Sequence, residues 1–261
     1  MNLIDYDIQI IDEQNPLKRI EICGRTCYNS LDKMKEGSAR KFVDMLVNAG
    51  HCSVLEHCRV LVPRDVCNQL AENMQGKRPP YGMPDRCSVL YSEMKNGQGL
   101  YNNYTVMNAR DFIAIGGTVD QLATFTVSDD YYTVRMTIPI AMSRELCRHR
   151  EDSFSEQSTR YCNYAKQGLV FTMPQQFELD DEDYHFLELC EAQYNRCIEK
   201  KGMKPQQARF FLPLMTRTEL VMSATKENWK HVLALRDHKD ADPEMQVIMK
   251  LLKDTNGFNI N

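Results

Sequence analysis

Apolar and polar residues alternate along this chain of 261 residues in a pattern that predicts both strands and helices. The predicted strands cover residues 6–12, 60–62, 101–107, 131–140, 169–173 and 218–223. The predicted helices cover residues 15–30, 36–48, 64–75, 108–117 and 183–201, and two more lie within residues 226–252, separated at Asp242-Pro243. Residues 118–130 fit neither pattern clearly. Strands and helices therefore follow one another in mixed order, which indicates a protein built from both kinds of element.

Two segments outside this simple alternation carry their own predictions. Residues 76–86 contain three prolines and two glycines, which exclude regular structure and indicate a lid or a linker. Residues 183–201 instead show apolar side chains at helical spacing, which predicts a face buried in the core. The side chains expected on that face are Phe186, Leu187, Leu189, Tyr194 and Ile198.

The clearest predicted strand, residues 131–140, leads into a segment with a high density of reactive side chains. Residues 148–164 read RHREDSFSEQSTRYCNY and include three arginines, one histidine and three acidic residues. A solvated charged face is the ordinary interpretation of such a run. Glycine and proline, which usually mark surface loops, are absent from it. The pattern therefore favours a functional site at the end of a sheet strand.

The spacing of polar side chains in this region points to an anionic ligand. Arg144 and Arg148 are four residues apart on an expected helix, so their guanidinium groups would share one face and repel each other. Guanidinium groups bind phosphates and planar carbonyl edges with two hydrogen bonds at a time, which favours a nucleotide. If the chain is extended further on, Glu156, Ser158 and Arg160 line one wall of the site.

The composition limits the classes of protein that the chain can represent. Its net charge of −4 argues against general binding of nucleic acids, which requires a basic surface. The hydrophobic fraction of 43% and the charged fraction of 26% are typical of a globular protein. Ten cysteines without a regular framework indicate reduced thiols in a cytoplasmic protein. No apolar run approaches the roughly 18 residues of a membrane span, so we expect a soluble protein without a membrane partner.

Two His-Cys pairs, at residues 51–52 and 57–58, are the candidates for a metal site. Zinc sites usually combine two units whose ligands are spaced by about two to four residues, and the sequence contains no second unit of that kind. We therefore expect no metal ion. For His57, a histidine that is hydrogen-bonded within the core is the alternative to a functional role.

The segment at residues 148–164 resembles the signature of the flavin-dependent thymidylate synthases, in which Arg-His-Arg is followed by spaced Ser, Glu-x-Ser and Arg-Tyr. The matching residues are Arg148, His149, Arg150, Ser153, Glu156, Ser158, Arg160 and Tyr161. Further matches to that family are residues 24–28, His51, Ser53, Glu56, His57, Ala208, Arg209, Leu212, Pro213, His231 and Arg236. Their order and spacing agree along most of the chain, so the resemblance implies a single domain of this family over residues 1–261.

The chain departs from the family pattern at four places. Ser155 replaces the usual Asn, Cys27 replaces the expected Ser, and Glu145 stands where relatives often carry Gln. The usual Asn-x-Arg near the last helices is Thr225-Lys226-Glu227. In the family, the arginine at this position is assumed to contact the pyrophosphate of the flavin cofactor. Because Glu227 has the opposite charge, that contact is not carried over to this chain.

The resemblance implies an α+β fold, a largely antiparallel sheet flanked by helices, in a homotetramer whose active sites lie between subunits. It implies an enzyme that converts dUMP to dTMP. Methylenetetrahydrofolate would donate the carbon, FAD would carry the hydride, and NADPH would be the reductant. In that family the flavin supplies the reducing power, so no protein thiol is required. We therefore expect neither Cys147 nor Cys162 to act as a nucleophile.

The resemblance also implies the role of each site residue. The expected catalytic residues are Arg236, which would stabilise negative charge on the uracil ring, and His57. The expected contacts of FAD are Cys27, His57, Arg148, His149, Arg150, Glu156 and His231. The expected contacts of the nucleotide are Glu145, Arg148, Glu156, Gln157, Ser158, Arg160, Arg209 and Arg236.

Three other functions remain open at this stage. A nucleotide-binding homologue with weakened flavin binding is compatible with Cys27, Thr225 and Glu227. A relative that methylates another uridine nucleotide is also possible, since no residue is identified that would reject a 2′-hydroxyl group. An RNA-binding protein could use the arginines on phosphates, but it would need a basic surface that this acidic chain lacks.

Overall fold

The computed structural model describes residues 2–73 and 104–260. The chain divides into two compact units. The first unit comprises Met1–Ile11, Arg25–Leu31 and Tyr132–Asn261, and the second comprises Asp12–Gly24 and Asp32–Tyr131. Residues 76–86, predicted to form a lid or a linker, lie outside the described residues, as do the first residues of the predicted strand 101–107.

The first unit contains most of the segments that the sequence marks as functional. Its strands are β1 (Asn2–Ile4), β2 (Asp7–Ile10), β6 (Tyr131–Pro139, of which the first residue belongs to the second unit), β7 (Ser153–Glu156), β8 (Val170–Thr172) and β9 (Arg217–Thr225). Its helices are α7 (Ile140–Leu146), α8 (Tyr164–Gln167), α9 (Asp181–Glu199), α10 (Pro205–Ala208), the 3-10 helix η3 (Arg209–Phe211), α11 (Lys226–Arg236) and α12 (Pro243–Asp254).

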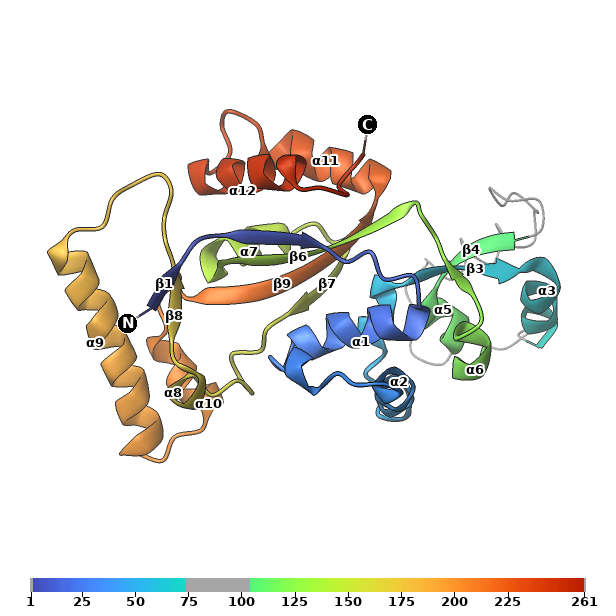
Figure 1. Cartoon of the computed structure of the whole chain (residues 1–261), viewed down its shortest axis with the longest axis horizontal. Coiled ribbons are helices and arrows are strands. Elements are labelled where there is room, and N and C mark those ends of the chain that lie inside the picture. The colour runs from blue at the N-terminus through green and yellow to red at the C-terminus, as the bar shows by residue number, and fades with distance from the viewer. Residues whose placement is uncertain (1, 74–103, 261) are drawn as a thin grey trace. The chain divides into compact units, whose positions relative to one another are not determined.

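The main sheet of the first unit has the strand order β2-β6-β9-β7, and its outer pairs, β2 with β6 and β7 with β9, are antiparallel. Beside it, β1 and β8 form a short parallel pair. Helices α11 and α12 lie along the main sheet (Figure 1). The first unit is thus a mixed structure with a largely antiparallel sheet and flanking helices, which confirms the predicted α+β class.

The core of the first unit forms where α11 and α12 cover the main sheet. Apolar side chains at alternating positions of β6, such as Val134, Met136 and Ile138, are fully buried because β-branched and aliphatic residues pack well on a pleated surface. Trp229 of α11 is buried among them and meets Phe258 edge to face, with 5.4 Å between the ring centroids. This packing holds the carboxyl ends of β6 and β9, and therefore α7 and α11, in place.

The second unit has its own core and sheet. Its elements are α1 (Pro16–Thr26, of which the last two residues belong to the first unit), the 3-10 helix η1 (Leu31–Lys33), α2 (Ser38–Asn48), the 3-10 helix η2 (Cys52–His57), β3 (Arg59–Pro63), α3 (Arg64–Asn73), β4 (Tyr104–Asn108), α5 (Ala109–Ala114), α6 (Val119–Leu122) and β5 (Thr126–Val127). The strand order is β4-β3-β5, with antiparallel pairs. Helix α2 ends before Gly50, whose φ of +71° is the left-handed conformation that favours glycine.

The predicted elements agree with the structure within a few residues at most positions, with two instructive differences. The ambiguous residues 118–130 contain the short helix α6 and the short strand β5. On α9, Leu187 and Tyr194 are buried as predicted, but the placement of Phe186 and Leu189 in the core was wrong. These two side chains are 58% and 53% exposed, because α9 packs against its neighbours along only one narrow face.

Candidate functional site

The predicted signature forms a tight turn between α7 and β7, in the first unit. Helix α7 ends at Leu146, and backbone N–H groups of Arg148 and His149 donate to the carbonyl groups of Glu145 and Leu146. The backbone then turns again, since Asp152 N–H donates to the His149 carbonyl at 3.2 Å. The expectation that Arg148 continues the helix was therefore wrong.

The end of α7 separates the two arginines that were expected to share a face. Arg148 lines a hollow with α11, whereas Arg144 lines a second hollow with the segment after β7. The two arginines therefore line different hollows and do not share one face of a continued helix. Each hollow nevertheless contains its own group of arginines.

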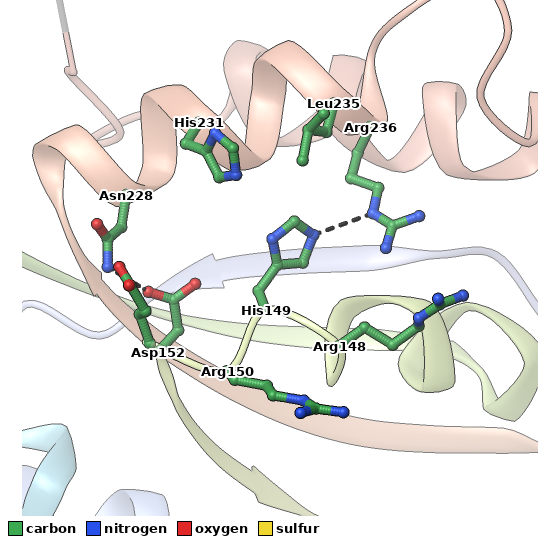
Figure 2. A pocket seen from close by; sticks show the side chains of 9 residues that line it. Arg148, His149, Arg150, Asp152, Asn228, His231, Leu235 and Arg236 are labelled. Atoms are coloured by element: carbon green, nitrogen blue, oxygen red, sulfur yellow. Dashed lines mark hydrogen bonds between the residues drawn. The ribbon is translucent and has the colours of Figure 1, made fainter.

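The first of these, which we call the histidine hollow, lies between the turn and one face of α11 (Figure 2). It is an open cavity of about 750 Å³. Its lining residues are Arg148, His149, Arg150, Glu151 and Asp152 from the turn, and Asn228, His231, Leu235 and Arg236 from α11. The α11 residues recur at helical spacing and so face the same side. Five of the nine are positively charged or titratable to a positive charge, which makes the hollow suited to an anion.

Arg236 is the most constrained side chain in the histidine hollow. Its Nη1 donates to Glu145 Oε2 at 2.6 Å, and its Nη2 donates to the Glu145 carbonyl oxygen at 2.7 Å. Its Nε donates to His149 Nε2 at 3.0 Å, the contact drawn as a dashed line in Figure 2. Glu145, which stands where relatives often carry Gln, is therefore paired with Arg236.

These contacts leave His149 neutral. The pKa of His149 falls from its ordinary value to about 4, because the imidazole is partly buried and lies near Arg236 and His231. The two histidine rings meet edge to face at 6.2 Å between centroids. His149 is thus an uncharged imidazole among arginines at neutral pH.

The second hollow, which we call the arginine hollow, lies beside α7 and has a volume of about 590 Å³. Its lining residues are Ile140, Arg144, Glu156, Gln157, Ser158, Thr159, Arg160, Arg209, Phe210, Leu212, Pro213 and Leu214. Glu156, Ser158 and Arg160, which were expected to line one wall, all line this hollow, but so do Gln157 and Thr159, so the alternation behind that expectation is absent. The extended conformation behind that prediction holds only to Glu156, where β7 ends, because Arg160 lies in a turn.

Charge in the arginine hollow is positive. Three arginines face one carboxylate, that of Glu156, which accepts a hydrogen bond from Ser143 Oγ at 2.7 Å. Arg209 Nη1 donates to Thr159 Oγ1 at 3.5 Å, a weak contact that leaves most of the guanidinium group available. The arrangement can bind a phosphate with several charge-assisted hydrogen bonds.

Of two further predicted site residues, Gln157 lines this hollow and Cys27 contacts the backbone of one of its lining residues. Gln157 is 3% exposed, and its Oε1 accepts a hydrogen bond from Arg217 Nη1 at 2.8 Å, so its carboxamide is already engaged within the protein. The carbonyl oxygen of Cys27 accepts a hydrogen bond from Ser158 N–H at 2.8 Å. Burial raises the pKa of the Cys27 thiol. Cys27 thus supports the backbone of the hollow through its main chain.

His57 lies in the second unit, at the end of the 3-10 helix η2. Its side chain is fully buried, and its carbonyl oxygen accepts a hydrogen bond from Arg19 Nε at 3.3 Å. Its neighbour in the predicted motif, Glu56, forms an ion pair with Arg110. This burial agrees with the alternative interpretation of His57 as a core histidine, and a catalytic role remains a prediction.

The two cysteines Cys147 and Cys162 both have raised pKa values, although Cys147 is exposed. Desolvation of its sulfur and the nearby Glu156 carboxylate raise the pKa of Cys147 to about 11. Burial also raises the pKa of Cys162, which is 2% exposed. A reactive thiol needs a lowered pKa and an accessible position.

Residues 2–73 and 104–260 contain no cluster of three or more His, Cys, Asp or Glu that could hold a metal ion. In the same part of the chain, no helix is long and apolar enough to span a membrane.

Several lining residues were not predicted as site residues from the sequence. In the histidine hollow these are Glu151, Asp152, Asn228 and Leu235, and in the arginine hollow they include Arg144, Thr159 and Phe210. Asn228, His231 and Leu235 are three and four residues apart, so the helical spacing from His231 could have identified the other two. From the sequence, Arg144 was expected to share a helix face with Arg148, whereas in the structure it lines the arginine hollow with Arg160 and Arg209.

Comparison with known proteins identifies similar sequences. The family described as thymidylate synthase complementing protein matches residues 4–73 and 126–255. A flavin-dependent thymidylate synthase of Aquifex aeolicus is 28% identical over 162 residues, which cover 54% of this chain and 50% of that protein. A flavin-dependent thymidylate synthase of Thermococcus onnurineus is 31% identical over 121 residues, covering 42% and 47%. The chain thus matches about half the length of these relatives.

Solved structures of low sequence identity also resemble the chain. A UMP/dUMP methylase from Streptomyces cacaoi, bound with 5-Br dUMP, aligns with a TM-score of 0.44 at 18% identity over 97% of this chain and 90% of that one. A flavin-dependent thymidylate synthase from Helicobacter pylori, complexed with FAD and dUMP, aligns with a TM-score of 0.43 at 18% identity over 96% and 93%.

Proposed function

The chain belongs to the family of flavin-dependent thymidylate synthases, and from this premise we propose that it converts dUMP to dTMP. In the proposed reaction, methylenetetrahydrofolate donates the carbon and NADPH is the reductant. The observation that supports the proposal most strongly is the pair of cationic hollows on either side of the α7 end, one with imidazole rings and one with three arginines.

The arginine hollow is the proposed site of the nucleotide phosphate. A phosphate monoester carries about two negative charges near neutral pH, and the hollow has an excess of two positive charges from Arg144, Arg160 and Arg209 over Glu156. Ser158 offers a hydroxyl group at the same wall. The Gln157 side chain is held by Arg217 and its backbone N–H donates to the Glu219 carbonyl oxygen at 2.8 Å, so a contact of Gln157 with the nucleotide would need one of these bonds to open.

The histidine hollow fits the FAD that the family implies. Its open volume of about 750 Å³ accommodates part of a dinucleotide, and Arg148 and Arg150 provide donors for a pyrophosphate. His149 and His231 provide planar rings at its centre. When bound, FAD supplies the hydride that completes the methyl group. Glu156, Cys27 and His57 stay proposed contacts of the cofactor.

Arg236 is proposed to act on the uracil ring. A guanidinium group has five N–H donors, and three of them are engaged with Glu145 and His149, so two remain for a ligand. Because the group is held by three bonds, it needs little rearrangement to stabilise negative charge on the ring oxygens. Arg148 and Glu145, at the same edge, would complete the nucleotide contacts.

The reaction is proposed to proceed without a protein thiol nucleophile. The raised pKa values of Cys147 and Cys162 support this part of the proposal, since both thiols stay protonated at neutral pH. The alternative way of making thymidylate, addition of a thiolate to C6 of uracil, requires a cysteine with the opposite shift.

A second candidate function is a nucleotide-binding homologue with weakened flavin binding. The observation that favours it is Glu227, an exposed acid in the first turn of α11 at the position where the family usually carries an arginine. This candidate would bind dUMP but not FAD.

The experiment that separates these functions is a titration of the purified chain with FAD, followed by absorption and fluorescence, in the presence and absence of dUMP. The proposed enzyme binds FAD at micromolar concentration and becomes yellow. Binding of dUMP by a chain that does not bind FAD would favour the second candidate. Light scattering on the same sample tests the homotetramer, and limited proteolysis tests whether residues 1–261 behave as one domain.

A further inference from the structure

The three bonds of Arg236 define the protonation of His149. An arginine Nε can only donate a hydrogen bond, because guanidinium has no acceptor atom. Since Arg236 Nε meets His149 Nε2 at 3.0 Å, that ring nitrogen accepts and carries no proton. The proton of a neutral imidazole is then on Nδ1. In Figure 2 the second ring nitrogen of His149 lies on the side away from Arg236.

We propose that Glu145 is a positioning residue that holds Arg236 against His149 and thereby fixes His149 as a neutral Nδ1–H tautomer. His149 then offers an uncharged N–H donor to an acceptor atom of the ligand in the histidine hollow, such as a ring carbonyl or ring nitrogen. The identity of that ligand as a flavin depends on the proposed function, whereas the tautomer does not.

Glu145 is suited to this role because it accepts two hydrogen bonds from Arg236. Its carboxylate and its own backbone carbonyl accept from different guanidinium nitrogens, at 2.6 and 2.7 Å, so the guanidinium plane cannot rotate without breaking both bonds. Both side chains are largely shielded, at 19% exposure for Arg236 and 30% for Glu145. A charge-assisted pair in such a position is less screened than a surface pair.

The charges around His149 favour the neutral ring. The cations that line the same hollow are Arg148, Arg150 and Arg236, and His231 lies beside the ring. Of the acids, Glu145 is engaged with Arg236, and Asp152 accepts from Asn228 Nδ2 at 2.8 Å. Glu151 is exposed to solvent. The lowered pKa of His149 agrees with this balance of charges.

A consequence is that His149 adds no positive charge to the hollow. If His149 were charged, it would add a fourth cation and would have no lone pair to accept from Arg236 Nε. The guanidinium group would then be displaced. Protonation of His149 and correct placement of Arg236 therefore exclude each other.

The test is nitrogen NMR of the full chain labelled with ¹⁵N-histidine and measured without flavin. The chain contains six histidines, and His149→Gln identifies the signals of residue 149. We expect the spectrum of an Nδ1–H tautomer that does not titrate between pH 6 and 8. In Glu145→Ala we expect a mixture of tautomers and a pKa raised by at least about one unit.

Two further variants distinguish a positioning role of Glu145 from a general contribution of this residue to folding. Glu145→Gln keeps an acceptor for Arg236, so the tautomer should be retained. Glu151→Gln removes an acid that lines the same hollow without contacting Arg236, so it is the matched control and should leave the signals of His149 unchanged. If Glu145→Ala does not fold by circular dichroism, Arg236→Lys gives the same comparison, because it keeps the charge and removes the Nε donor.

An Nε2–H tautomer in the unaltered chain, or titration of His149 near its ordinary pKa, would overturn the proposal. So would an unchanged His149 spectrum in both Glu145→Ala and Arg236→Lys. Failure to bind FAD would instead affect the proposed function and would leave the NMR result intact. The two outcomes are distinguishable because the NMR measurement needs no ligand.

Discussion

Replacing Arg209 by alanine tests the arginine hollow directly. The residue is exposed in η3, its guanidinium group lies over the ring of Phe210 at 6.0 Å, and among the described residues that group makes a weak hydrogen bond to Thr159. The protein should therefore fold normally without it. What the substitution removes is one positive charge from the proposed phosphate site.

The magnitude follows from the exposure of Arg209. Two unit charges 4 Å apart in water interact by about 1 kcal/mol, and a phosphate with about two negative charges doubles this value to about 2 kcal/mol. A charge-assisted hydrogen bond is independently worth about 1.5–3 kcal/mol. Both routes predict that Arg209→Ala weakens binding of dUMP by about 30-fold, since 1.4 kcal/mol corresponds to tenfold.

The assay is isothermal titration of the variant with dUMP and with deoxyuridine, which lacks the phosphate. Affinity for deoxyuridine should stay the same, and the loss for dUMP should shrink at high salt because exposed charges are screened. Arg196→Ala, which removes an exposed arginine of α9 outside both hollows, is the control. Equal weakening of the two ligands would refute the assignment of Arg209 to the phosphate.

Three further predictions concern the thiols, the core and the histidine hollow. Cys147→Ser and Cys162→Ser, singly and together, should retain dUMP-dependent formation of dTMP within about tenfold, or 1.4 kcal/mol of barrier, and a loss of several orders of magnitude with ligands still bound would indicate a covalent mechanism. Trp229→Ala should destabilise the first unit by about 3–5 kcal/mol in urea unfolding followed by circular dichroism, because a fully buried ring is removed. The pKa of His149 in the folded chain is lower than its ordinary 6.5, so its contribution to stability is present above pH 6.5 and is lost as the pH falls toward 4. In His149→Gln the urea concentration at the unfolding midpoint should therefore depend less on pH between 4 and 6.5. The same pH dependence in the variant and in the unaltered chain would count against the buried neutral ring.

The success of the sequence-based predictions depended on how local the determining interactions are. Strand β6 could be predicted because its β-branched and aromatic residues favour a strand in themselves. The end of α7 could not, because no glycine or proline marks it and Cys147 still has helical backbone angles. Arg148 was therefore placed on the wrong face. On α9, spacing alone did not reveal that Phe186 and Leu189 lack a partner surface in the described chain.

In the candidate site, too, local features could be predicted from the sequence and long-range contacts could not. The signature residues of the turn were recognised from their order in the chain. The bond between Arg236 and Glu145 joins residues 91 positions apart, and this pair was not predicted from the sequence. Asn228 was not predicted, whereas the neighbouring Glu227, at which the sequence departs from the family, is exposed and does not line the histidine hollow. Which side chains meet across the hollow depends on the packing of α11 on the sheet, which is a long-range property.

The most direct test of the proposed function is the formation of dTMP from dUMP by the purified chain, measured by chromatography of the nucleotides. Complete reactions contain FAD, NADPH and methylenetetrahydrofolate, and each is omitted in turn. The proposal predicts dTMP in the complete reaction and none when FAD is omitted from chain freed of flavin. Absence of dTMP from a complete reaction in which the chain has bound both FAD and dUMP would contradict it.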